Sequence, residues 1–412
     1  MTLAAFRVRS FRFQWPADFL TSWAFEMDTL ILGWYVMVNT GSVVWLTAFG
    51  SLQFLGTLAA PVFGVLGDRL GSRTMLCAMR ALYAALAALV MVLAAAALLT
   101  PAWVLVVAAL GGILRPNDQV MRNALIGETI PRDHLIGALG MSRASMDSAR
   151  VAGSLAGAGL STALGLGLAY VFVTSFYVAS LALTFGISRR HPVPDPGAIP
   201  RGAPGGIASG MPRASRYGDL MDGLAHVWTT PTLLAAMLLA FLVNLCAYPF
   251  SGGLLPYVAQ RVYLVDATGL GWLVASFSIG ALLGSITIVV TGGSRRPARS
   301  MLVYTMLWYA LLLVFGHVRS LGAGVVLLLL AGFVQSIAMI SLMGTLLAVT
   351  GDRFRTRVMG ARTLAVYGLP LGLIGAGVLI DHIGYPLTVS VCCAVGLGLT
   401  LLIGLRWRAS MW

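Results

Sequence analysis

Long apolar stretches alternate with short polar, arginine-rich breaks along the whole chain. Each stretch is roughly 20 residues long, which at 1.5 Å per residue matches the ~30 Å hydrocarbon core of a membrane. Lipid offers the backbone no hydrogen-bond partner, so a stretch that crosses it must be helical. The alternating segments of about ten residues that mark a membrane barrel are absent from the sequence. The pattern therefore predicts an all-α membrane protein.

Twelve transmembrane helices are predicted, six before and six after a long polar stretch. They cover residues 17–39, 43–67, 74–98, 101–126, 137–163, 166–188, 231–257, 267–291, 299–318, 320–349, 358–380 and 384–406. This division gives an N-terminal six-helix bundle at 1–188, a linker at 189–230 and a C-terminal six-helix bundle at 231–412.

The linker has two parts. Residues 189–215 are rich in Pro, Gly and Arg, which predicts a flexible segment. The residues that follow can form a short amphipathic helix, with Leu220, Leu224 and Val227 on one face. We expect that helix to lie at the membrane surface.

The charge distribution predicts the topology. The chain is 58% hydrophobic and 10% charged, its net charge is +13, and its basic residues are all Arg. If the N-terminus is cytoplasmic, the predicted cytoplasmic segments hold 23 Arg, and the opposite loops hold only Arg261 and Arg319. An excess of Arg marks cytoplasmic loops, so both termini are expected in the cytoplasm, and the net charge needs no nucleic-acid partner.

No metal or cofactor is expected. The four cysteines and five histidines lack the spacing of metal ligands, and the chain has neither a catalytic constellation nor a phosphate-binding loop. These absences argue against an enzyme and against an ATP-driven pump.

An internal repeat groups the helices into two halves. GDRLGSRTML at 67–76 and GSRRPARSML at 293–302 share five of ten residues at an offset of 226, each after the second helix of its half. Two parallel halves with one site between them are typical of transporters.

The loop after the second helix resembles that of the major facilitator superfamily. It reads Gly64-Val65-Leu66-Gly67-Asp68-Arg69-Leu70-Gly71-Ser72-Arg73. The resemblance implies the two-bundle fold of that family and a latch that holds the halves together when the cytoplasmic side is shut. Gly64 would allow close helix packing and Gly71 would supply the turn. The latch candidates are Gly64, Asp68, Arg69, Gly71, Arg73 and Arg122.

The repeat is asymmetric at this loop. Ser294 and Pro297 stand in the second copy where the first has Asp68 and Gly71. We therefore expect Asp68 to carry the latch.

Two further stretches narrow the resemblance. Residues 115–159 and 351–384 are similar to the prokaryotic exporter branch that includes macrolide efflux and enterobactin export proteins. In one respect the chain departs from the antiporters of this superfamily. They often have Gly-Pro in a glycine-rich fifth helix, and Gly153-Ser154 stands here instead.

Six charged residues are predicted near the middle of the membrane, all in the first half. Such groups are costly in lipid and are therefore candidates for function. They are the proton or substrate site candidates Glu26, Asp28, Arg115, Asp118, Asp147 and Arg150.

The spacing of these charges limits their roles. Arg115 and Asp118, like Asp147 and Arg150, are three residues apart and close enough for contact on one helix face. Glu26 and Asp28 lie about 200° apart around a helix, so only one can face the centre, and the other must find Arg115, Arg150 or a polar neighbour. The six charges sum to −2, so a surplus acid could take up a proton.

The second half has polar and aromatic candidates instead. Asn244, Tyr248, Gln335 and Tyr367 are the expected cavity-lining residues there. An acidic wall facing an aromatic and polar wall suits a lipophilic or cationic compound.

The leading hypothesis is a secondary active transporter that exports a drug-like compound or natural product, driven by a proton gradient through Glu26 or Asp28. The alternatives are a lipid or siderophore carrier and a membrane sensor without transport activity. The expected partners are a small-molecule substrate and the lipid bilayer. We expect a monomer in the bacterial inner membrane.

Overall fold

The computed structural model describes residues 6–57, 63, 66–67, 70–187, 227–292, 294, 296–350, 358, 362 and 365–408. Across these ranges the chain is helical and has no strand. The predicted linker at 189–215 lies outside the described residues, as does most of the amphipathic helix. Its last turn, at 227–229, is helical, and Val227 packs into the core of the second half.

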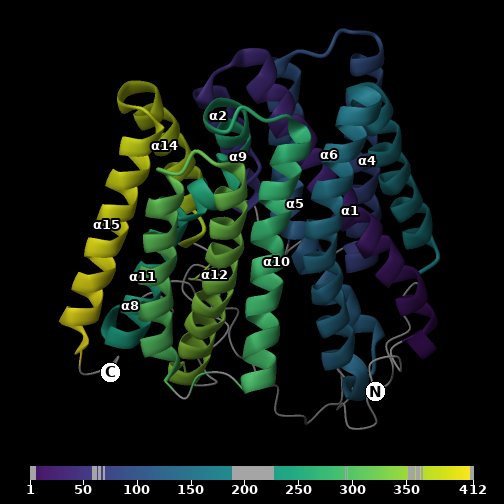
Figure 1. Ribbon diagram of the computed structural model, residues 1–412. Coiled ribbons are helices and arrows are strands. Elements are labelled where there is room, and N and C mark those ends of the chain that lie inside the picture. The colour runs from purple at the N-terminus through teal and green to yellow at the C-terminus, as the bar shows by residue number, and fades with distance from the viewer. Residues whose placement is uncertain are drawn as a thin grey trace, which may run out of the picture.

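The first half contains α1 (Arg9–Thr40), α2 (Val43–Leu52), the 3₁₀ turn η2 (Leu55–Thr57), α4 (Ser72–Ala95), α5 (Pro101–Thr129) and α6 (Arg132–Phe185). The second half contains α8 (Pro231–Cys246), the π-helical turns η3 (Pro249–Gly253) and η4 (Val258–Val262) on either side of α9 (Leu255–Tyr257), α10 (Ala267–Thr291), α11 (Pro297–Phe315), α12 (Leu321–Val349), α14 (Gly368–Ile383) and α15 (Tyr385–Arg406). In Figure 1 the helices stand side by side, and α1 begins at the same end of the bundle where α15 ends.

The predicted boundaries agree with the structure to within a few residues at most helices and differ more at the first, second, seventh and eleventh. The second, predicted over 43–67, is interrupted after Leu52 by a turn that leads into η2, and the eleventh, predicted from 358, is interrupted by a turn at 366–367 before α14 begins. The first helix starts at Arg9 rather than residue 17, since Pro16 is accommodated inside α1. The seventh continues past residue 257 through the π-helical turn that ends at Val262. The predicted break between 163 and 166 is confirmed at Gly165, whose φ of 77° interrupts α6.

Seven helical stretches of the described chain are long and apolar enough to cross a membrane, and two shorter apolar helices, Val43–Thr57 and Gly368–Ile383, accompany them. α1 and α5, with 32 and 29 residues, are long enough but carry charged residues along their length. Large apolar side chains such as Val289, Val290 and Leu402 are exposed on the outer surface. Such a surface suits contact with lipid.

The buried core is organised by halves. One cluster of apolar residues belongs to α1, α2, α4, α5 and α6 and to Ile187 just after α6, and a second belongs mainly to the helices after residue 231. The strongest packing between the halves joins α2 to α14 and α6 to α10. It lies at the end of the bundle opposite the start of α1, where Thr268 donates to Thr162 and Ser51 donates to the carbonyl of Pro370.

Candidate functional site

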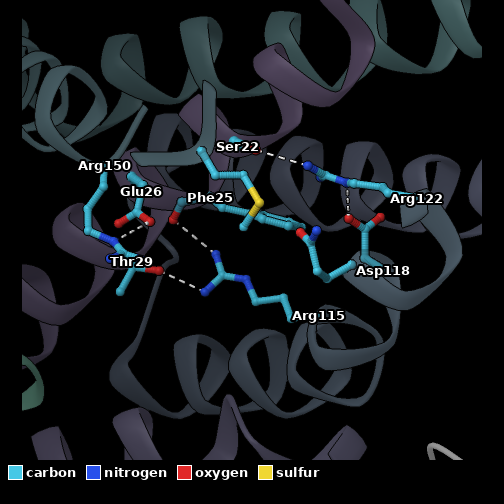
Figure 2. Close-up of a pocket in the computed structure, with 10 residues that line it drawn as sticks. Ser22, Phe25, Glu26, Thr29, Arg115, Asp118, Arg122 and Arg150 are labelled. Atoms are coloured by element: carbon cyan, nitrogen blue, oxygen red, sulfur yellow. Dashed lines mark hydrogen bonds and ion pairs between the residues drawn. The ribbon is translucent and has the colours of Figure 1, made fainter. Parts of the chain in front are cut away.

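A cavity of about 200 Å³ opens between α1, α5 and α6. The residues from α1 recur on one face of the helix, because spacings of three and four residues bring side chains to the same side. Figure 2 shows the cavity and its polar lining. The lining consists of Ser22, Phe25, Glu26, Thr29, Arg115, Asp118, Gln119, Arg122, Met146 and Arg150.

Glu26 and Arg150 form the most accessible ion pair of this cavity. Their closest atoms, Oε1 and Nε, are 3.5 Å apart, and the side chains are 30% and 39% exposed. Arg150 lies in the neighbourhood of Tyr248 of the second half, which places the pair near the boundary between the halves. A long and partly exposed ion pair is weak, so either partner can exchange for another ion.

Asp28 points away from this cavity, into a small void that Tyr83 and Tyr177 also line. Its carboxylate pairs with Arg115 at 3.1 Å and accepts a 2.5 Å hydrogen bond from the hydroxyl of Tyr170. Glu26 is therefore the acid that faces the cavity, and Asp28 is the acid that pairs with Arg115.

Arg115 ties three helices together around Asp28. Its guanidinium donates to the hydroxyl of Thr29 at 2.7 Å, to the carbonyl of Phe25 at 3.0 Å and to the amide oxygen of Gln53. It also lies 4.6 Å from the centroid of the Phe25 ring. Through these bonds Arg115 of α5 connects α1 with Gln53 at the end of α2.

A second group of charges is sealed inside the first half. Asp18 of α1 pairs with Arg80 of α4 and lies 3.7 Å from Arg122 of α5, which pairs in turn with Asp118. These four side chains are at most 6% exposed. Arg80 also donates to Thr184 of α6. We call Asp18, Arg80, Asp118 and Arg122 the buried quartet.

The pairing considered for Arg115 with Asp118, and for Asp147 with Arg150, is wrong. Among the described residues Arg115 pairs with Asp28, and Asp118 pairs with Arg122. Asp147 likewise pairs with the exposed Arg143 at 3.3 Å, while its predicted partner turns to Glu26. Tertiary packing decides the partners of Arg115 and Arg150, which lie on neighbouring helices, whereas Asp118 and Asp147 each pair with an arginine four positions away on the same helix.

The surplus of acid expected at mid-membrane is also wrong. Each of the four acids of the group has an arginine partner, because the structure adds Arg122 and Arg143 to the two arginines counted from the sequence. Proton uptake at this site therefore requires an ion pair to separate.

The second half brings two of its four predicted residues together. Gln335 donates to the hydroxyl of Tyr248 at 2.7 Å, and the Tyr248 ring packs edge-on against Trp308. Asn244 instead donates to the carbonyl of Ala240 on its own helix. Tyr367 lies in the turn before α14, and its hydroxyl has no partner among the described residues.

The latch residues are described in part. Gly64, Asp68 and Arg69 lie outside the described residues. Gly71 has a φ of 83° and precedes α4, as the predicted turn requires. Arg73 donates to the carbonyl of Phe185 at 2.7 Å. Arg122 belongs to the buried quartet inside the bundle, and its described partners are there.

Sequence reasoning missed Asp18, Arg80, Gln53 and Tyr170. Arg80 is one of the 23 arginines that the topology prediction assigns to the cytoplasmic side, although it is completely buried on α4. A signal for Asp18 was present, because Asp18, Ser22 and Thr29 continue the polar face of α1 that includes Glu26. Nothing in the spacing pointed to Arg80 or Tyr170.

A bundle of apolar helices around a charged cavity is the construction of a membrane transporter. The chain belongs to the Major Facilitator Superfamily, whose sequence pattern it matches over residues 15–370. Proteins of this family are transporters rather than enzymes.

One relative is the multidrug efflux pump Tap of Mycolicibacterium fortuitum, 25% identical over 287 residues. The match covers 68% of this chain and 66% of that protein, so it spans just under two thirds of the relative's length.

Solved structures share the fold over nearly the whole chain. The nucleoside transporter NupG superposes with a TM-score of 0.70 at 13% identity, covering 97% of this chain and 98% of that one. An inward-facing, unoccupied bacterial homologue of the human lysosomal transporter Spinster gives 0.69 at 14% identity, with 97% and 98% covered. The human organic anion transporter MFSD10 gives 0.64 at 16% identity, with 96% and 99% covered.

Proposed function

We propose that this protein is a secondary active exporter that moves a lipophilic or cationic drug-like compound by alternating access, in exchange for protons. The similarity to a multidrug efflux pump supports the class of substrate. The observation that carries the proposal is the Glu26–Arg150 pair, which lines the cavity and is more exposed than the Asp28–Arg115 and Asp118–Arg122 pairs.

Glu26 is the exchanging acid in this proposal. A proton or a cationic substrate group would take the place of Arg150 on the carboxylate, and the two cannot occupy it together. Such mutual exclusion is what an exchange of substrate for proton needs. Tyr248 and Gln335 would face the apolar part of the substrate from the second half. Asp28 would act as an anchor for Arg115 rather than as the exchanging group.

We further propose twelve spans in two six-helix halves, at 1–188 and 231–412, joined by the linker at 189–230. The termini would be cytoplasmic in a bacterial inner membrane, as the arginine distribution indicates. The protein would work as a monomer without a cofactor, driven by the proton gradient. The strong packing of α2 on α14 and of α6 on α10 supports a conformation open toward the termini.

The test is transport in proteoliposomes with an imposed pH gradient, using tetraphenylphosphonium and ethidium as cationic probes. We expect the gradient to drive both probes in the unchanged protein, and Glu26→Gln to lose the gradient-driven component. Asp381→Asn, an equivalent change at an exposed site on α14, should transport normally.

Full gradient-driven transport by Glu26→Gln would overturn the role of Glu26 as the exchanging acid, and full transport by Asp28→Asn as well would overturn proton coupling at both acids. Failure to move either probe under both gradient polarities would overturn drug export, and would favour a lipid or siderophore carrier or a sensor.

A further inference from the structure

Asp118 lies where the cavity meets the buried quartet. It lines the cavity together with Glu26, yet its side chain is only 2% exposed. One carboxylate oxygen, Oδ2, pairs with Arg122, and the other, Oδ1, has no hydrogen-bond partner among the described residues. A buried carboxylate with a free oxygen beside a polar cavity is placed to receive a proton from water in that cavity.

Arg122 is shared between two carboxylates. Its Nε pairs with Asp118 and lies 3.7 Å from Oδ1 of Asp18, and its Nη1 already donates to the carbonyl of Asp18 at 3.1 Å and to Ser22 at 2.9 Å. Figure 2 shows Arg122 reaching from Asp118 toward Ser22 of α1. Its guanidinium therefore has a second acid on α1 within reach.

Asp18 has room for a stronger bond to Arg122. Arg80 occupies its Oδ1, whereas its Oδ2 receives only a long 3.4 Å hydrogen bond from Gln14. A buried arginine left without a carboxylate strongly destabilises a protein. Asp18 avoids that outcome, since it can take over Arg122 when Asp118 becomes neutral.

The elements around Asp118 differ in the titratable side chains that they bring near it. α2 and η2 have no titratable side chain. The groups that face it are Asp18 and Glu26 on α1, Arg80 and Tyr83 on α4, Arg115 and Arg122 on α5, and Tyr177 and Arg150 on α6.

We propose that Asp118 is a second proton-accepting acid of the cavity and that Arg122 is its positioning residue. A proton from cavity water binds Oδ1 of Asp118, the Asp118–Arg122 pair separates, and Arg122 pairs with Asp18 instead. The quartet, neutral before, then carries one positive charge beside the cavity.

The positive charge that the quartet gains when Asp118 is protonated would repel a cation bound near Glu26. Both acids line one cavity, so a proton on Asp118 and a cation in the cavity disfavour each other. Here the inference rests on the proposed function, in which a cation occupies this site. Protonation of Asp118 itself does not depend on it.

The test of protonation is infrared difference spectroscopy of the purified full-length protein between low and high pH. A protonated carboxylic acid has a C=O stretching band that a carboxylate lacks. We expect a band in the unchanged protein that is lost in Asp118→Asn, is kept by the exposed-site control Asp381→Asn, and returns, shifted, in Asp118→Glu. If the spectrum of Asp118→Asn equals that of the parent, the proposal is wrong.

The test of the exchange uses tetraphenylphosphonium as the probe. Its addition to weakly buffered protein should release protons, and Asp118→Asn should release fewer than the parent. Equal release would overturn the role of Asp118 in exchange. If Glu26→Gln transports normally but the infrared band maps to Asp118, the proposed role of Glu26 fails and this inference stands.

The role of Arg122 predicts an asymmetry in stability. Asp118→Asn should lower the unfolding temperature much less than Asp18→Asn, because Arg122 can move to Asp18 in the first variant, whereas Arg80 loses its carboxylate in the second. Equal losses in the two variants would overturn the sharing of Arg122.

Discussion

Glu26 on α1 and Arg150 on α6 lie 3.5 Å apart with about a third of each side chain exposed, while Asp18 and Arg80 form a pair with almost no exposure. The same first half thus holds a loose ion pair at its cavity and a tight one in its core. Energies of ion pairs depend strongly on burial, so the two pairs should respond differently to mutation.

Arg150→Gln should tighten the binding of a cation. In the parent, a cationic probe has to displace Arg150 from Glu26, and the variant removes that competitor. Equilibrium binding of tetraphenylphosphonium to the purified protein measures the effect, and we expect a lower Kd. Arg150→Lys keeps the positive charge and should bind like the parent. Weaker binding by Arg150→Gln would contradict Glu26 as the cation site.

Arg80→Gln should lower the free energy of unfolding by about 3 kcal/mol or more, because it leaves the buried Asp18 with its more distant partner alone. The matched control is Arg143→Gln, whose side chain is 67% exposed and whose pair with Asp147 should contribute about 1 kcal/mol or less. Thermal unfolding of the two variants in detergent gives the comparison. Similar losses would mean that burial does not distinguish these pairs.

Gly112→Ala should destabilise the first half by about 1–3 kcal/mol through overpacking. A Cβ at Gly112 would overlap the backbone of Leu52 and Gln53, where α5 crosses the end of α2. The neighbouring Gly111 has open space around its Cβ position, so Gly111→Ala should be neutral or stabilise α5 by up to about 1 kcal/mol. Thermal unfolding separates the two, and an equal effect would argue against close packing at Gly112.

A disulfide between Cys residues at 162 and 268 should stop transport. The hydroxyls of Thr162 and Thr268 are 3.3 Å apart across the boundary between the halves, so a Thr162→Cys/Thr268→Cys variant can form the bond after small adjustments. If the halves separate at this end during transport, oxidation should block movement of ethidium into or out of proteoliposomes and a reductant should restore it. Either single variant should be insensitive to oxidation. Undiminished transport by the cross-linked protein would show that this contact never opens.

Most helices could be located from the sequence because each signal is local. A run of apolar residues long enough to cross a membrane must satisfy its backbone internally, whatever surrounds it. The break at Gly165 was predictable as well, because its signal is also local in the sequence. The extension of α1 back to Arg9 was not, since its first two turns are polar on one side, and only their packing makes Phe11 and Gln14 part of the core.

The sequence identified most residues of the candidate site but not which of them form ion pairs with each other. Glu26, Asp28, Arg115, Asp118 and Arg150 stand out because charges are rare in apolar helices. Their partners depend on which helices are neighbours and how each is rotated. Arg80 illustrates the limit, because in the sequence it resembles any other arginine near the end of a membrane helix.

The sequence by itself determined the all-helical membrane class, the family and the presence of charges within the first half, because hydropathy and motif spacing are properties of the chain. Tertiary structure alone decided that Glu26 rather than Asp28 faces the cavity, that Arg122 and Arg143 pair with Asp118 and Asp147, and that Arg80 is buried against Asp18. Ion pairs between helices form over a few ångströms in space, and residues more than 60 positions apart in the chain meet there only after the bundle has assembled.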